Sequence, residues 1–151
     1  MKARFPKDVV FHAGPRLMVY RPHGILTEAR VREIVQFLEE AEDHASGPFN
    51  RFTDLSKLDA LDIDFKTMIS ISLHRRLTYA RHPSIKSAFY VTSPAAARVV
   101  KVHVILTDHS PLRAKMFKDL DEAAKWLGVS KDILQSRKGA HNGRIASGGE
   151  G

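Results

Sequence analysis

Short β-type runs alternate with helical patterns along this chain, and that alternation limits the folds it can adopt. Apolar runs at residues 9–12 and 16–21 flank Ala13-Gly14-Pro15, a turn signal, so they predict a β-hairpin. Further strands are expected at the β-favouring runs 49–55, 88–92 and 112–117. A hairpin followed by repeated strand–helix units predicts an α/β fold with a mostly parallel sheet and helices packed against it.

Two of the expected helices have apolar stripes. The first begins after Thr27, a good N-cap, and its apolar positions are Val31, Ile34, Val35, Leu38 and Ala41. The second starts near Phe65 and ends at the His82-Pro83 pair. The residues expected on its buried side are Phe65, Met68, Ile69, Leu73, Leu77 and Ala80.

The segment Ala95–Leu106 is ambiguous, because its many β-branched residues have strong β-propensity. The preceding Ser93-Pro94 pair suits an N-cap and a first helical position, which favours a helix. This segment has more apolar positions than one stripe needs, so it is expected in the core, at a dimer surface or in the wall of an apolar pocket. The candidates for such a pocket or dimer face are Met68, Leu73, Val99 and Val102.

The length of 151 residues suits one compact domain, expected over residues 1–136. Residues 137–151 are rich in Gly, Ser, Lys and Arg and predict a disordered tail. No apolar run approaches the roughly 20 residues that span a bilayer, and no secretory signal follows the N-terminus. The expected location is therefore cytoplasmic. Because the chain has no cysteine, disulfides, thiolate metal sites and cysteine nucleophiles are excluded.

Aspartates cluster between the third expected strand and the second helix, at Asp54, Asp59, Asp62 and Asp64. Carboxylates suit a divalent cation, but the EF-hand turn glycine and closing glutamate are missing. Aspartate favours helix starts, so we interpret Asp59, Asp62 and Asp64 as helix-start acids. The eight histidines form no short His-x-x-x-His pair, and no serine elbow, P-loop or dinucleotide motif is present. The sequence therefore assigns no metal, other cofactor or catalytic residue.

Charge is unevenly distributed along the chain. Residues 28–64 hold 10 acids against 4 bases, whereas residues 65–118 hold 10 bases against one acid. The candidates for an anion-binding patch on neighbouring helix faces are His74, Arg75, Arg81, Arg98 and Lys101. The alternatives are a solvated mixed surface and a contact with the acidic first helix of a second copy. Nucleic acid is disfavoured because no aromatic residues are interleaved with these bases.

Three short motifs resemble the SpoIIAA-like family, a STAS-related group. They are Gly24-Ile25-Leu26-Thr27, Asp54-Leu55-Ser56 and the segment from Met116 to Leu127, in that order. The resemblance covers roughly residues 9–128 and implies a four- or five-stranded sheet with helices largely on one side, used as a binding or regulatory module. Some relatives resemble lipid carriers of the CRAL-TRIO group. The phosphorylatable serine of the anti-sigma antagonists has no counterpart in Leu61–Phe65, so no phosphorylation switch is expected.

The sequence therefore predicts a non-enzymatic, STAS-related regulatory, interaction or small-ligand-binding module. A homodimer is expected, with a protein partner or a small apolar or anionic ligand. The alternative is an anionic-lipid or phosphate-ligand binder that uses the basic helix faces. In the case of an anionic lipid, this function is compatible with peripheral contact with a membrane surface and needs no transmembrane segment.

Overall fold

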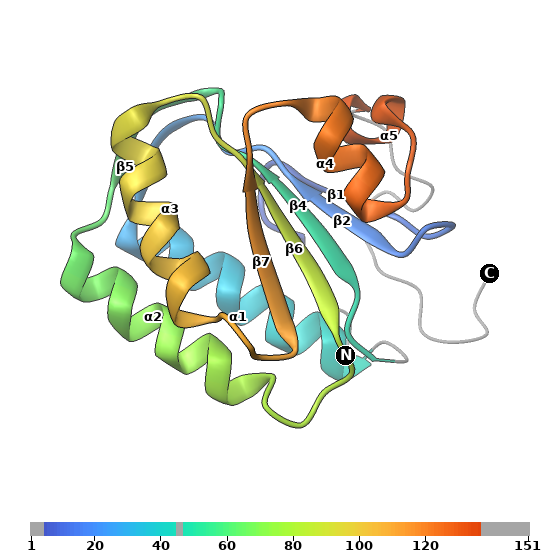
Figure 1. Cartoon of the computed structure of the whole chain (residues 1–151), viewed down its shortest axis with the longest axis horizontal. Coiled ribbons are helices and arrows are strands. Elements are labelled where there is room, and N and C mark those ends of the chain that lie inside the picture. The colour runs from blue at the N-terminus through green and yellow to red at the C-terminus, as the bar shows by residue number, and fades with distance from the viewer. Residues whose placement is uncertain (1–4, 45–46, 137–151) are drawn as a thin grey trace.

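The computed structural model describes residues 5–44 and 47–136, and the expected tail 137–151 lies outside them. A twisted central sheet has helices on both faces (Figure 1). The sheet order is β1-β2-β4-β6-β7, with strands β1 (Val9–His12), β2 (Leu17–Tyr20), β4 (Asn50–Asp54), β6 (Ile85–Tyr90) and β7 (Leu112–Phe117). The helices are α1 (Glu28–His44), α2 (Phe65–Thr78), α3 (Pro94–Leu106), α4 (Leu120–Leu127) and α5 (Lys131–Gln135). The predicted α/β class is confirmed.

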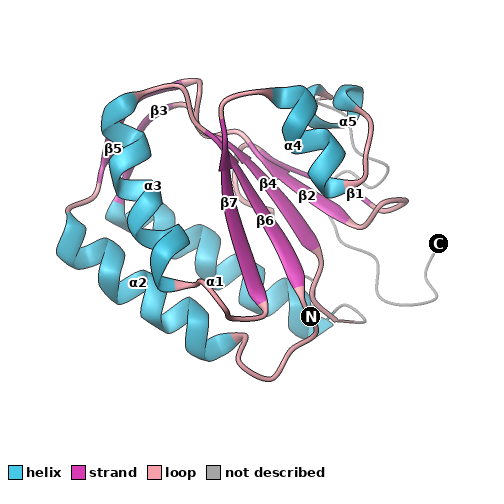
Figure 2. Ribbon diagram, in the orientation of Figure 1, coloured by secondary structure: helices cyan, strands magenta, loops and turns pink. Residues whose placement is uncertain are grey.

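The hairpin β1–β2 is antiparallel, and all the other neighbours in this sheet are parallel. Side chains alternate between the two faces of a strand, and β2 is buried on both. Met18 and Tyr20 pack in a core with α1 and α3, whereas Leu17 and Val19 pack with α4 and α5. Figure 2 shows the resulting layers, with α1, α2 and α3 grouped on one side and α4 and α5 on the other.

A second, two-stranded parallel sheet was not expected from the sequence. It pairs β3 (Gly24–Thr27) with β5 (Leu58–Asp62) and lies beside α3 in Figure 2. The Leu-Asp-Ala-Leu-Asp sequence of β5 is rich in residues that are depleted in strands. Pairing with β3, far away in the sequence, therefore makes this segment a strand. Asp59 and Asp62 lie in β5, so the prediction that they begin a helix was wrong.

Side-chain caps begin three of the helices as the sequence indicates. The Oγ1 of Thr27 accepts from the backbone N–H of Arg30 (3.3 Å), and Asp64 accepts from the N–H of Thr67 (2.7 Å). Ser93 caps α3 and Pro94 follows it. The ambiguous segment 95–106 is thus helical, because start signals and packing outweigh its β-propensity.

The orientation of α2 differs from the prediction. Its buried residues are Met68, Ile71, Ser72 and Arg75. The predicted members Phe65, Ile69, Leu73 and Leu77 are 52%, 43%, 45% and 76% exposed, and the predicted member Ala80, just beyond the helix, is exposed as well. Two faces of α2 satisfy a helical period, and the protein buries the one that contains polar side chains. The site described below supplies partners for those polar groups, which explains the choice.

Candidate functional site

Strand register places six side chains in a block on the sheet face that α1, α2 and α3 cover. Met18 is aligned with Arg51, and Arg51 is aligned with Ser87. Two residues further along, Tyr20 is aligned with Thr53 and Thr53 with Phe89. Because alternate residues of a strand share a face, these six side chains form the floor of one site.

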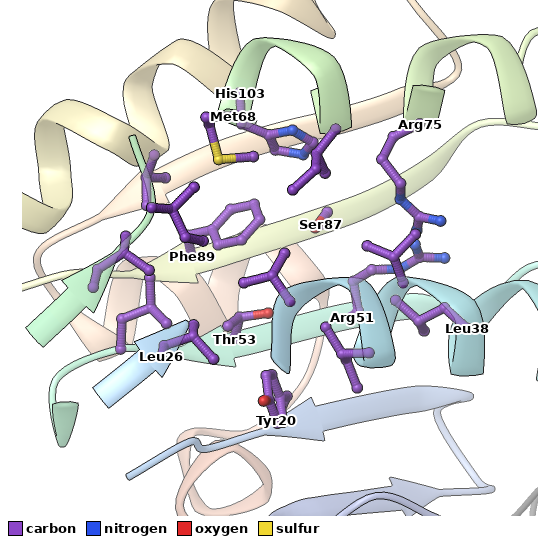
Figure 3. A pocket seen from close by; sticks show the side chains of 18 of the residues that line it. Tyr20, Leu26, Leu38, Arg51, Thr53, Met68, Arg75, Ser87, Phe89 and His103 are labelled. Carbon is purple, nitrogen blue, oxygen red and sulfur yellow. The ribbon is translucent and has the colours of Figure 1, made fainter. Parts of the chain in front are cut away.

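A cavity of about 110 Å³ lies between this floor and the helices. Its walls come from α1, α2, α3 and the small sheet, and most of the lining groups are aliphatic or aromatic. In Figure 3 the side chains of Arg51 and Arg75 meet at one end of the cavity, while Met68, Phe89 and His103 lie together farther along it. The cavity therefore has an apolar body and a cationic end.

The cationic end is part of a buried network centred on Tyr79. Arg51 and Arg75 are 3% and 4% exposed, and the Nη2 of Arg75 donates to the Tyr79 hydroxyl (3.1 Å). Both guanidinium groups lie over the Tyr79 ring, with Cζ 5.2 and 4.8 Å from its centroid. The Nη2 of Arg51 donates to the Oε2 of Glu42 (2.6 Å), and the Nη1 of Arg75 donates to the Oε2 of Glu39 (3.2 Å). Tyr79 donates to the other oxygen of Glu42.

Burial sets the protonation states in this network. It lowers the pKa of Arg75, as does the adjacent Arg51 cation. The unperturbed pKa of an arginine side chain is so high that Arg75 still keeps its charge. Burial also raises the pKa of Tyr79, against the opposing effect of the two arginines. At neutral pH Arg75 is therefore a cation and Tyr79 a neutral phenol.

His103 on α3 is the second polar feature of the cavity wall. Its Nδ1 forms a 2.9 Å hydrogen bond with the hydroxyl of buried Ser72 on α2, and its ring packs edge-on against Phe89. Burial, with a smaller effect from the positive Arg75 and Arg51, lowers the pKa of His103 to about 3. The ring is therefore neutral at physiological pH and belongs to the polar but uncharged part of the lining.

Several polar groups of the lining have no partner within residues 5–44 and 47–136. The buried Nε of Arg51 has no acceptor there. The hydroxyls of Thr53 and Ser87, which also line the cavity, make no hydrogen bond to the described part of the chain. A buried donor without a partner costs about 1–3 kcal/mol. Such groups around an apolar cavity are typical of a binding site.

The five residues predicted as an anion-binding patch are not all exposed. Arg75 is buried and belongs to the network above, so its prediction as an exposed patch residue was wrong. His74 is exposed and shares the Oε2 of Glu39 with Arg75 (2.9 Å). Arg81, Arg98 and Lys101 are exposed, the first after α2 and the others on α3.

The four residues predicted for an apolar pocket or dimer face also lie in different surroundings. Met68 lines the cavity. Val99 and Val102 pack where α3 meets α2, and Leu73 faces outward. Of the three helix-start acids, only Asp64 caps a helix, and its bonds from Thr67 lower its pKa. No three His, Asp or Glu side chains of the described residues come together as metal ligands.

Sequence reasoning missed Arg51, Glu42, Tyr79, Thr53 and Ser87. One signal was readable: Arg51 falls on the apolar face of a strand with buried neighbours, where an arginine needs a partner. Its partners Glu42 and Tyr79 lie 9 and 28 residues away along the chain, and only the fold brings them together.

Comparison of the chain with protein-family models, with curated proteins and with solved structures finds no match. No helix among the described residues combines the length and apolar character needed to cross a membrane. The functional argument therefore depends on the geometry of the site.

Replacing Glu42 tests the energetic role of the network. Glu42→Gln removes the charge that pairs with buried Arg51, and breaking a buried ion pair costs about 3–5 kcal/mol. We expect the free energy of unfolding, measured with urea, to fall by about 3 kcal/mol. Glu40→Gln changes an exposed residue of the same helix and should cost less than about 0.5 kcal/mol. Equal effects of the two substitutions would contradict the role given to Glu42.

The neutral state of His103 predicts acid sensitivity. Between pH 6.5 and about 3 the unfolded chain binds a proton at this residue and the folded protein does not. Stability is therefore fully present above pH 6.5 and falls with pH, by up to about 1.4 kcal/mol per pH unit from this group.

In His103→Gln this slope should decrease, as measured by urea unfolding between pH 7 and pH 4.5. Some slope will remain, because burial lowers the pKa of His12 as well. His109→Gln, at an exposed position, is the control and should leave the slope unchanged. An undiminished slope in His103→Gln would show that this residue is not buried in its neutral form.

Proposed function

We propose that this protein is a non-enzymatic small-ligand-binding module and that its ligand occupies the cavity above β2, β4 and β6. The observation that carries the proposal is a mostly apolar cavity whose lining includes Arg51, a residue whose buried Nε has no partner among the described residues. A ligand with an acceptor group satisfies that donor, and its apolar part fills the remaining space. Nothing in this arrangement requires a reacting group.

The cavity size suits a compact ligand. A cavity of about 150 Å³ lined by aliphatic and aromatic residues can hold benzene, and the cavity here is about 110 Å³. A branched group of about four carbon atoms is of the right order for this space. Larger ligands require the helices to move apart.

The resemblance to the SpoIIAA-like family is part of this proposal. A ligand site between the sheet and its helices agrees with the binding role that the resemblance implies. The position of the missing serine corresponds to the end of β5 and the start of α2, where Asp64 caps the helix. The proposed activity is therefore binding without a phosphorylation switch.

Filling the cavity tests the proposal. In Val100→Phe the added ring occupies the space that Val100 borders, so 3-methylbutan-1-ol, a neutral probe of matching size, should no longer raise the melting temperature. Ile105→Phe enlarges an exposed residue of the same helix and should keep the wild-type response. Circular dichroism checks that both variants fold, and Ser87→Val provides a second, smaller filling. If the wild type shows no response to this probe or to any acid tested below, the cavity is not a ligand site.

A specific observation also favours the predicted role in protein interaction. Phe65, Ile69, Leu73 and Leu77 recur every four residues and form an exposed apolar ridge, which we call the α2 stripe. Monomeric surfaces rarely present such a continuous apolar patch without a partner. We propose that the α2 stripe contacts the same stripe of a second copy.

Charge at the ends of α2 supports antiparallel pairing. Exposed Asp62 and Asp64 precede the helix, and exposed Arg81 and His82 follow it. A two-fold axis across the stripe brings the acidic end of each copy to the basic end of the other, and it sets Phe65 against Leu77 and Ile69 against Leu73. Such a self-complementary contact is the usual form of a homodimer interface.

Light scattering after size exclusion tests this interface. We expect a dimer for the wild type and a monomer for Leu73→Glu, because each new carboxylate would be buried without a partner against Ile69 of the other copy. Lys101→Glu, at an exposed position on α3, should remain dimeric. A wild type that stays monomeric at about 100 µM, roughly ten times a Kd of ~10 µM, would contradict the proposal.

A further inference from the structure

We propose that the ligand of the cavity is a compact apolar carboxylic acid, bound as its carboxylate at the end where Arg51 and Arg75 meet. This inference rests on the proposed function and adds the chemical class of the ligand. It follows from the distribution of charge around the cavity, the donors that no described residue pairs with and the size of the apolar body.

The charge that borders the cavity is positive. Two guanidinium groups line it and, among the described residues, no carboxylate does. Glu39 and Glu42 bind the two arginines but are not part of the lining; they border surface hollows instead. The arginines thus separate the cavity from their own counter-ions, and an anion in the cavity meets cations first.

The unpaired donors suit a carboxylate. Within the described part of the chain the Nε of Arg51 has no acceptor, and Ser87 lies beside Arg51 in the parallel register of β4 and β6. A carboxylate has two acceptor oxygens and takes charge-assisted hydrogen bonds from a guanidinium. One oxygen on Arg51 and the other on the Ser87 hydroxyl would pair with groups that no described residue satisfies.

The rest of the lining limits the ligand body. Met68, Phe89 and Val100 contribute carbon surface, and the volume of about 110 Å³ excludes a long chain. A phosphate group requires donors around three or more oxygens, which this lining does not supply. The ligand that fits is a short branched acid with a single carboxylate.

The inference can be tested by calorimetry with the full chain at neutral pH. Isovalerate is the acid probe, and isovaleramide has the same shape without the charge. We expect isovalerate to bind about tenfold more tightly or better, because hydrogen bonds to charged groups are the stronger ones. Octanoate tests whether the site prefers a short acid or a long fatty acyl chain. We expect it to bind more weakly than isovalerate.

Two variants locate the carboxylate. Arg51→Lys keeps the charge beside Glu42 but removes the Nε donor. In this variant we expect most of the difference in affinity between isovalerate and isovaleramide to be lost. Ser87→Ala removes the hydroxyl without touching the network and should weaken isovalerate severalfold. Arg98→Lys, on the exposed face of α3, is the matched control and should bind as the wild type does.

The outcomes separate the two proposals. Equal affinity for isovalerate and isovaleramide would overturn the claim that the ligand binds as a carboxylate and would leave the cavity as an apolar site. An unchanged preference for isovalerate in folded Arg51→Lys and Ser87→Ala would do the same. Tighter binding of octanoate than of isovalerate would overturn the claim that the ligand is a short acid. No binding of either acid, of the amide or of 3-methylbutan-1-ol overturns the proposed function itself.

Discussion

The need to satisfy two buried arginines organises this structure. Arg51 comes from the central strand β4 and Arg75 from α2, and both lie over the ring of Tyr79 with their charges balanced by Glu42 and Glu39. An unpaired cation in such surroundings costs several kcal/mol. The network therefore fixes how α1 and α2 lie relative to the sheet.

The same constraint accounts for the unusual face that α2 buries. Rotating α2 to bury the α2 stripe would place more apolar side chains in the core. It would, however, break the hydrogen bonds of Arg75 with Tyr79 and of Ser72 with His103. The observed orientation keeps these hydrogen bonds and leaves the α2 stripe exposed on the surface. An internal polar end and an external apolar stripe are thus two consequences of one packing choice.

The sequence predicted the parts that depend on local signals. The hairpin, the α/β class and the caps at Thr27, Asp64 and Ser93 follow from neighbouring residues. The sheet formed by β3 and β5 did not, because its pairing is long-range and β5 has poor strand propensity. Nor did the site, since Arg51 meets Glu42 and Tyr79 only after folding. The helical period of α2 fitted two faces, and polar partners that no local pattern shows decided between them.

The central claim, a ligand cavity with a cationic end, is tested most directly by methionine methyl NMR. Met18 and Met68 line the cavity from β2 and α2, whereas Met116 on β7 is not part of the lining. On titration with isovalerate, the methyl resonances of Met18 and Met68 should shift together and saturate, while that of Met116 should stay in place. Unchanged resonances for Met18 and Met68 at saturating probe would contradict the account.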